Sequence, residues 1–162
     1  MRDDSARWNA PSSLDYASDD LSVIEVTLPS QIWVSGTDVL QIYKDKLVSW
    51  PDIVAAQNYA LALRRDRLLL VGAAQPLSGF NIQQGHATSD VSDAYKVIDI
   101  SGKRAFDRLR HGAELNLDKP SASVMRRAFG VDVLLYRVGT DARFRLHVPR
   151  ALMQSVFQQL IS

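Results

Sequence analysis

The stretch Thr88–Leu117, TSDVSDAYKVIDISGKRAFDRLRHGAELNL, decides the fold. Within it, Tyr95–Ile100 alternates two sets of side chains that both include apolar members, which predicts a strand lying between two layers. Ser101-Gly102 predicts a tight corner after the strand, and Lys103–Arg110 predicts an amphipathic helix. None of these residues forms a recognisable catalytic group, so the stretch predicts a structural centre rather than an active site.

The composition is that of a globular protein. The chain has 162 residues, of which 46% are hydrophobic and 23% charged, enough to bury a proper core. The N-terminus is too polar for a signal peptide, and no apolar run reaches the length of a membrane span. Without cysteine the chain has no disulfide and no thiolate metal site. We expect a cytoplasmic protein that binds neither membrane nor nucleic acid.

Charge is spread unevenly along the chain. The net charge is +1, but residues 1–63 carry four basic and nine acidic side chains, whereas residues 64–162 carry fifteen and nine. Fourteen of the nineteen basic residues are arginine, which makes planar, bidentate contacts at interfaces more readily than lysine. Two interpretations stay open, a compositional bias of the genome and a charged docking surface.

The flanking segments alternate between strand and helix patterns. β-Branched or alternating apolar runs predict strands at 21–28, 31–34, 58–63, 67–71, 123–129, 131–138 and 143–148. Helical spacing predicts a helix from Val39 to Leu47, ended by Trp50-Pro51, and a closing helix at 151–161 with Leu152, Val156 and Leu160 on one face. Gly72–Gly85 predicts a loop or a short helix that joins two halves.

These elements predict an α+β fold built from two small units, each an antiparallel sheet with packed helices. The expected domain spans residues 21–162, with subdomains at about 21–85 and 86–162. Residues 1–20 lack periodicity and predict a flexible arm. Trp8 and Tyr16 stand out in this arm, either as anchors on a partner surface or as aromatics without a role.

The residues that could carry chemistry do not form a known catalytic pattern. His86, His111 and His147 show no metal-ligand spacing, and capping or packing explains them better. Asp90 and Asp93, with neighbouring serines, predict turn and cap chemistry, with a ligand-binding carboxylate pair as the alternative. The glycines match neither a dinucleotide loop nor a phosphate loop, and no nucleophile elbow is present.

Surface contacts offer more candidates. Arg64-Arg65 and Arg126-Arg127 are doublets beside apolar strands, suited either to a solvated sheet edge or to binding an anionic group. Trp33 is expected in the core, whereas Trp50, next to a proline at a helix end, is expected at a partner contact. The candidate interface residues are therefore Trp8, Tyr16, Trp50, Arg64, Arg65, Arg126 and Arg127.

The central stretch and the segments C-terminal to it resemble a known family. The DVSD segment, the apolar strand, Ser101-Gly102, the helix and HGAELNLD look like the gamma subunit of heterotetrameric sarcosine oxidase. The later segments RRAFGVDVLLYRVG and FRLHVPRALMQSVFQQL are similar to the next strands and closing helix of that family. The matching positions are Asp90, Ser92, Asp93, Ser101, Gly102, Gly112, Leu117, Phe144, Val148, Arg150 and Phe157. The resemblance covers about residues 59–162.

This resemblance implies a fold similar to the folate-binding domain of aminomethyltransferases. It implies a complex that oxidatively demethylates sarcosine or a related N-methyl amino acid, as in N-methylglutamate dehydrogenase. The alpha, beta and delta subunits would carry FAD, FMN, NAD, zinc and tetrahydrofolate, and this chain would bind no cofactor and supply no catalytic residue. The alternative function is a free-standing folate-binding or one-carbon-transfer domain, with Asp90, Asp93 or Asp99 holding the pterin. A third is an unrelated interaction protein.

Overall fold

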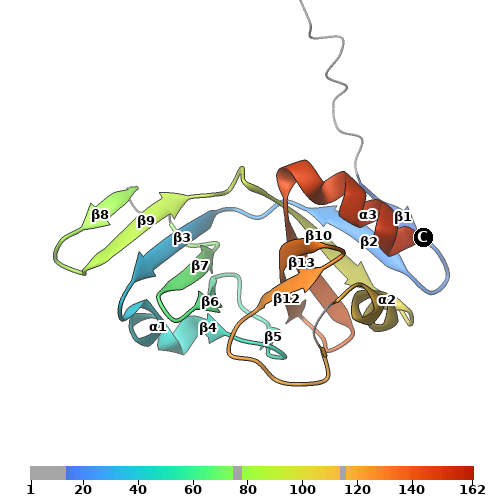
Figure 1. Cartoon of the computed structure of the whole chain (residues 1–162), viewed down its shortest axis with the longest axis horizontal. Helices are drawn as coiled ribbons and strands as arrows, with labels where there is room; N and C mark the ends of the chain where they lie inside the picture. Colours follow the sequence, from blue (N-terminus) through green and yellow to red (C-terminus); the bar gives the residue numbers. More distant parts are fainter. Residues whose placement is uncertain (1–13, 75–77, 114–115) are drawn as a thin grey trace, which may run out of the picture.

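The strands form two sheets that lie next to each other along the molecule (Figure 1). A computed structural model describes residues 14–74, 78–113 and 116–162. Both sheets are mainly antiparallel and short helices pack on them, so the α+β class and the paired sheet-and-helix units predicted from the sequence are confirmed.

The seven-stranded sheet is built around the central stretch. Its order is β1 (Tyr16–Ala17), β2 (Ser22–Val26), β10 (Tyr95–Ser101), β13 (Arg143–Pro149), β12 (Val131–Val138) and β11 (Met125–Ala128), and β5 (Ile53–Val54) runs parallel to β12. Strand β10 pairs antiparallel with β2 on one side and β13 on the other. The two-faced pattern of Tyr95–Ile100 therefore predicts both its strand and its interior place correctly.

The six-stranded sheet has the order β4 (Leu47–Val48), β6 (Tyr59–Arg64), β7 (Arg67–Val71), β3 (Gln31–Gly36), β9 (His86–Asp90) and β8 (Gly79–Asn81). The hairpin of β6 and β7 was predicted from its two apolar runs and is confirmed. Strand β8 replaces the loop or short helix expected within Gly72–Gly85, because it pairs with β9 as a second hairpin.

The helices are short and lie on the outer faces. Helices α2 (Ala105–Gly112) and α3 (Met153–Ile161) cover the seven-stranded sheet, with the 3-10 turn η3 (Arg150–Leu152) leading into α3. On the six-stranded sheet lie α1 (Val39–Ile42) and the 3-10 turn η2 (Lys44–Lys46), so the helix expected from Val39 to Leu47 is broken at Tyr43.

Helix α3 buries Val156 and Leu160, as its spacing predicts. Leu152 belongs to η3 before the helix and is 43% exposed, so the prediction that it shares one helix face with Val156 and Leu160 is wrong.

Three apolar clusters hold these layers. One lies between the seven-stranded sheet and its helices, where Ile98 and Leu146 meet Leu109 and Val156. Another lies between the six-stranded sheet and α1, with Val34 against Val39.

The third cluster joins the two sheets. Leu61 and Leu69 from β6 and β7 pack with Leu134 and Tyr136 from β12. Because this cluster draws on both sheets, they form one packed body, and the residues of β12 alternate between the helix side and the inter-sheet side.

The chain crosses between the sheets more often than the expected division at 85/86 allows. It begins in the seven-stranded sheet with β1 and β2 and builds the whole six-stranded sheet between β3 and β9. Within that segment β5 pairs with the seven-stranded sheet, to which the chain returns with β10. Strand β2 therefore belongs with the second unit and β9 with the first. Strands β1, β2 and β5 from the N-terminal half thus join β10 to β13 from the C-terminal half in one sheet, a pairing that local patterns do not show.

The N-terminal segment is folded from Leu14 onward. Leu14 is buried in the core of the seven-stranded sheet, and Tyr16 pairs with Val23. Residues 14–20 therefore belong to the domain rather than to a free arm, because Leu14 and Tyr16 have apolar surface to cover. Trp8 lies outside the described residues.

Replacing Gly102 with valine is expected to lower the free energy of unfolding by roughly 3 kcal/mol or more. Gly102 has φ +110°, a conformation that L side chains rarely adopt, and an added Cβ would collide with the carbonyl oxygen of Asp20. Gly139→Val is the matched control, because Gly139 has φ +71° but open space around it. Urea unfolding should show a smaller loss for Gly139→Val, and equal losses would contradict the collision.

Candidate functional site

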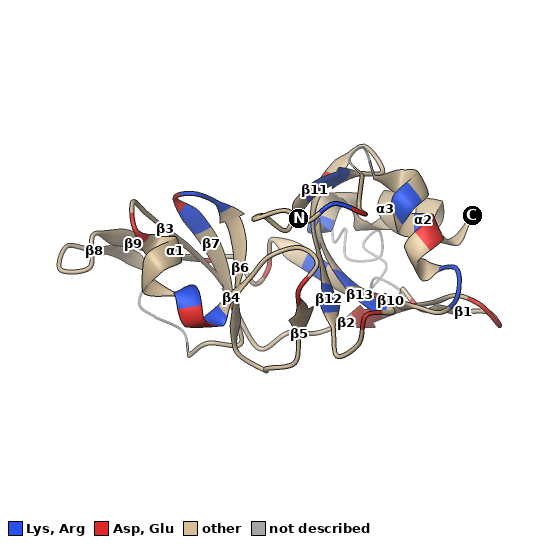
Figure 2. Ribbon diagram, turned by 90° about the horizontal axis from the view of Figure 1, so that it is seen from below, with Lys and Arg blue, Asp and Glu red and all other residues tan. Residues whose placement is uncertain are grey.

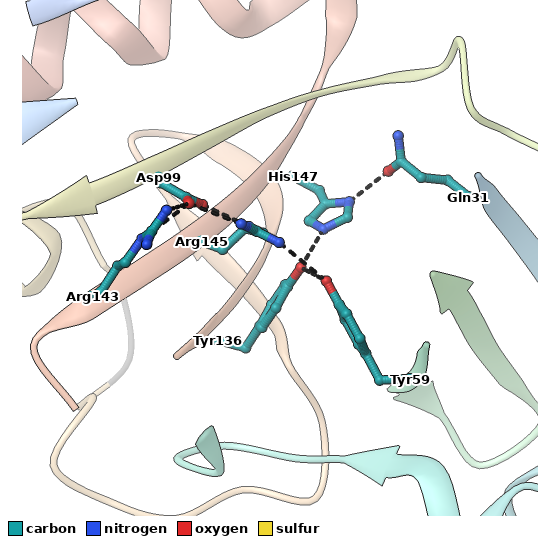
Figure 3. A network of polar contacts seen from close by, with 7 residues as sticks. All are labelled: Gln31, Tyr59, Asp99, Tyr136, Arg143, Arg145 and His147. Atoms are coloured by element: carbon teal, nitrogen blue, oxygen red, sulfur yellow. Dashed lines mark hydrogen bonds and ion pairs between the residues drawn. The ribbon is translucent and has the colours of Figure 1, made fainter. Parts of the chain in front are cut away.

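A network of polar side chains crosses the boundary between the two sheets (Figure 3). Gln31 and Tyr59 come from the six-stranded sheet, and the other members, Asp99, Tyr136, Arg143, Arg145 and His147, come from the seven-stranded sheet. The latter project from one face of neighbouring strands, since Tyr136 pairs with Arg145 and Asp99 also pairs with Arg145. We call these seven residues the inter-sheet network.

His147 lies at the centre of the network and is fully buried. Its Nδ1 lies 2.6 Å from Oε1 of Gln31, and its Nε2 lies 2.8 Å from the hydroxyl of Tyr136. Because Oε1 can only accept, Nδ1 carries the proton and donates, and Nε2 accepts from Tyr136. The Tyr136 oxygen then accepts from the hydroxyl of Tyr59 at 2.7 Å. The hydrogen bonds therefore run in one direction, from Tyr59 through Tyr136 and His147 to Gln31.

Burial sets the protonation state of this chain of hydrogen bonds. Burial, followed by the positive charge of Arg145, lowers the pKa of His147 to about 3, so the imidazole is neutral at neutral pH. Burial also raises the pKa of Tyr136 well above its usual value, and the neighbouring Tyr59 adds to the rise. Both groups are therefore fixed in their neutral forms at neutral pH and act as hydrogen-bonding partners there.

Asp99 holds the charged end of the network. One of its oxygens accepts from Nε of Arg145 at 2.6 Å, and the other from the NH2 groups of Arg145 and Arg143 at 2.8 and 2.6 Å. Burial acts to lower the pKa of Arg145, but the hydrogen bonds and charge of Asp99 raise it above the usual arginine value. Two arginines thus share one carboxylate, and Arg145 also reaches the Tyr59 hydroxyl at 3.5 Å.

The network is a closed structure rather than an open reaction centre. The ring nitrogens of His147 and the hydroxyls of Tyr59 and Tyr136 all have partners within it. A hollow of about 250 Å³ reaches Gln31 from outside, and its charged rim residues pair with each other, Lys96 with Glu25 and Arg150 with Asp93. Hydrogen bonds with fixed directions between the two sheets hold the sheets in one relative position.

The structure corrects two predicted interface residues. Trp50 is only 2% exposed, because its ring packs near Phe144 and its Nε1 donates to the carbonyl of Leu117 at 2.9 Å. Arg126 is 6% exposed; its guanidinium lies over the Trp50 ring and donates to the carbonyls of Ser123 and Met125. Neither side chain presents a surface to a partner.

The remaining interface candidates differ in exposure. Arg64 at the end of β6 and Arg65 in the turn to β7 are exposed, and Arg127 is exposed on β11. Tyr16 is half-buried against the core of the seven-stranded sheet. Trp33, expected in the core, is partly buried beside the inter-sheet cluster.

The predicted carboxylates do not meet in one site. Asp90 accepts from the amide and hydroxyl of Ser92, which lowers the pKa of Asp90, as turn chemistry predicts. Asp93 is exposed and bonds to Arg150. Asp99 lies in the inter-sheet network.

Among the other histidines, His86 is buried, and His111 contacts the Asp107 carbonyl near the end of α2, where a helix-end contact was expected.

Within residues 14–74, 78–113 and 116–162, no group of three histidine, aspartate or glutamate residues could hold a metal ion. No helix in this part of the chain is long and apolar enough to span a membrane.

Sequence reasoning missed Gln31 and Tyr136 as partners of His147, and Tyr59 as the partner of Tyr136. A usable signal was the opposite orientation of His147 to Leu146 and Val148, which the structure confirms. A histidine on the other face of a two-layered strand needs a polar partner in the second layer, and Tyr136, also on an apolar strand, needs one for the same reason.

Comparison with known proteins gives a likeness to solved structures. No family model and no curated protein matches the chain. Among solved structures, a chain of heterotetrameric sarcosine oxidase from Corynebacterium sp. U-96, in complex with pyrrole 2-carboxylate, matches with a TM-score of 0.69 at 19% sequence identity. The match covers 91% of this chain and 86% of that chain, so it includes both sheets rather than one. The chain thus shares the fold of a chain of heterotetrameric sarcosine oxidase, as the resemblance in its sequence predicts.

Proposed function

We propose that this chain is a non-catalytic, gamma-type subunit of a flavin-dependent complex that oxidatively demethylates sarcosine or a related N-methyl amino acid. The observation that carries the proposal is the likeness over 91% of this chain and 86% of a chain of heterotetrameric sarcosine oxidase. Because the two chains correspond over nearly their whole lengths, the simplest explanation is that they occupy equivalent places in similar assemblies.

The inter-sheet network supports a structural role for the chain. Its central groups, His147 and Tyr136, are buried, neutral at neutral pH and already hydrogen-bonded to each other. A general acid or base needs access to substrate and a pKa near the working pH, which burial denies to both. In the proposed complex FAD, FMN, NAD, zinc and tetrahydrofolate belong to the alpha, beta and delta subunits.

Each aspartate considered for a free-standing folate-binding domain already has a partner within the chain. Asp99 is shared by two arginines, Asp90 is bonded to Ser92, and Asp93 lies exposed beside Arg150. The proposal therefore gives the chain a place in an assembly and no pterin site of its own.

Expression of the tagged chain together with its neighbouring genes is expected to yield a stoichiometric complex with larger chains that carry bound flavin. Size-exclusion chromatography with visible absorbance detects the flavin, and turnover of sarcosine and other N-methyl amino acids identifies the substrate. Recovery of the tagged chain only in free form, from cells that make the neighbouring chains in soluble form, would sink the proposal.

The same preparation tests whether the chain is non-catalytic. A complex assembled with His147→Gln is expected to keep kcat per bound flavin within about twofold of the wild-type value, although its yield falls with stability. A large loss of kcat per flavin in a fully assembled complex would assign the network to the reaction.

A further inference from the structure

The hairpin of β8 and β9 forms the end of the six-stranded sheet farthest from the seven-stranded sheet (Figure 1). Strand β8 is the edge strand and pairs only with β9 among the described strands, through the pairs Gly79–Thr88, Phe80–Ala87 and Asn81–His86. One side of β8 therefore presents backbone groups that no described strand pairs. We call residues 79–85 the hairpin tip.

The hairpin tip carries the two most exposed large apolar side chains of the described residues. Ile82 is 85% exposed and Phe80 is 67% exposed. The residue across from Phe80 is Ala87, whose small side chain covers little of the ring. The other exposed large apolar side chains, Ile24, Ile42, Ile53 and Leu152, are 43–53% exposed and come from four different elements.

The hairpin tip also lacks the charges that usually protect a sheet edge. No lysine, arginine, aspartate or glutamate occurs from Gly72 to Ser89, although such residues make up 23% of the chain. In Figure 2 the end of the hairpin at β8 is accordingly tan. Native edges are commonly protected by lysine, proline or a bulge, and a neutral, apolar edge is a template for association.

We infer that the hairpin tip docks into an apolar, uncharged pocket on a partner protein chain, with Phe80 and Ile82 as the anchoring side chains. The inference rests on the proposed function, which supplies partner chains, and adds the element by which this chain holds one of them. The hairpin tip has no charge, so a charged group in the pocket would lose its water without gaining a counter-ion. An uncharged pocket avoids this cost.

The small exposed area of the hairpin tip favours a different protein chain, rather than a second copy of this chain, as its binding partner. Phe80 and Ile82 together expose on the order of 300 Å², well short of the roughly 800 Å² per partner that a stable interface buries. Two copies joined through a three-residue edge strand would have little else to bury. A larger partner can enclose the hairpin tip and also cover flanking surface, so that the two side chains act as central anchors.

The test compares complexes purified with the tagged wild-type chain and with Phe80→Ser/Ile82→Ser, each co-expressed with the neighbouring genes. The double variant is expected to weaken the affinity for the flavin-bearing chains on the order of 100-fold. Dilution followed by size-exclusion chromatography measures this loss. The free variant should unfold at the wild-type temperature, because both side chains lie mostly in water.

Ile42→Ser/Leu152→Ser is the matched control, since it also removes two exposed apolar side chains and should leave the affinity within about threefold. If the wild-type chain binds the flavin-bearing chains and the hairpin variant binds them equally well, the hairpin inference is overturned while the proposed function stands. If the wild-type chain recovers no such partner, the proposed function fails and the inference with it. A wild-type dimer that the double variant abolishes would make a second copy the occupant and overturn the inference.

Discussion

Replacing Asp99 with asparagine is expected to lower the free energy of unfolding by about 3–5 kcal/mol, the usual cost of removing one partner from a buried ion pair. Asp99 is 4% exposed and accepts hydrogen bonds from Arg143 and Arg145. Arg143 can turn into water, because half of its side chain is exposed, whereas only 11% of the Arg145 side chain is. Asparagine keeps the size of the side chain but leaves the Arg145 charge without a counter-ion. Urea unfolding at neutral pH measures the loss.

Asp93→Asn provides the control for this substitution. Asp93 also pairs with an arginine, Arg150, at 3.3 Å, but its side chain is fully exposed, so the expected change is within about 0.5 kcal/mol. In Asp99→Asn/Arg145→Gln the buried charge is gone, and part of the lost stability should return. If both substitutions lower the free energy of unfolding by the same small amount, Arg143 and Arg145 do not need Asp99 as a counter-ion.

The strands were predictable because their apolar residues alternate or form short β-branched runs. Tyr95–Ile100 carries apolar residues in both alternating sets, and β10 does lie between two strands with covered faces. The corner at Gly102 was likewise predictable from the Ser-Gly pair, and its positive φ confirms the reason. Such patterns depend only on neighbouring residues, so they can be interpreted without knowledge of the tertiary fold.

Sheet membership and side-chain partners were not predictable, because both depend on distant residues. Trp50 stands beside a proline at the end of a predicted helix, which suggested exposure, but Leu117, 67 residues later, supplies a carbonyl for its Nε1. Arg126 in turn covers the Trp50 ring, so a doublet that reads as a charged edge contains one buried arginine. The sequence shows the size and polarity of a side chain but not which distant residues contact it.

The inter-sheet network shows the same limit at the candidate site. The orientation of His147 was predicted from its neighbours, yet its partner Gln31 lies 116 residues away and Tyr136 lies on another strand. Burying a histidine without partners would be costly, so the sequence implied a polar neighbour and left its identity open. The pairing of β12 with β13 places Tyr136 near His147, and the crossings of the chain between the sheets, from β2 to β3 and from β9 to β10, bring Gln31 to them.

Acidification is expected to destabilise the folded chain through His147. The pKa of His147 is lowered to about 3 in the folded state, by burial and then by the charge of Arg145, against about 6.5 in an unfolded chain. Between these values the unfolded chain binds a proton that the folded chain does not. The stabilising contribution is therefore fully present above about pH 6.5 and is lost as the pH falls toward 3, with a slope of up to about 1.4 kcal/mol per pH unit.

The measurement is the free energy of unfolding in urea at several pH values between 7.5 and 4.5, for the wild-type chain and for His147→Gln. The glutamine amide also offers a donor group and an acceptor group but does not titrate, so the variant is expected to show a slope shallower by up to one proton. The difference between the two slopes isolates the contribution of His147, because the wild-type chain and the variant share every other titrating group. If His147→Gln keeps the full wild-type slope, carboxylates rather than His147 cause the loss, and the buried imidazole is not the acid-sensitive contact between the sheets.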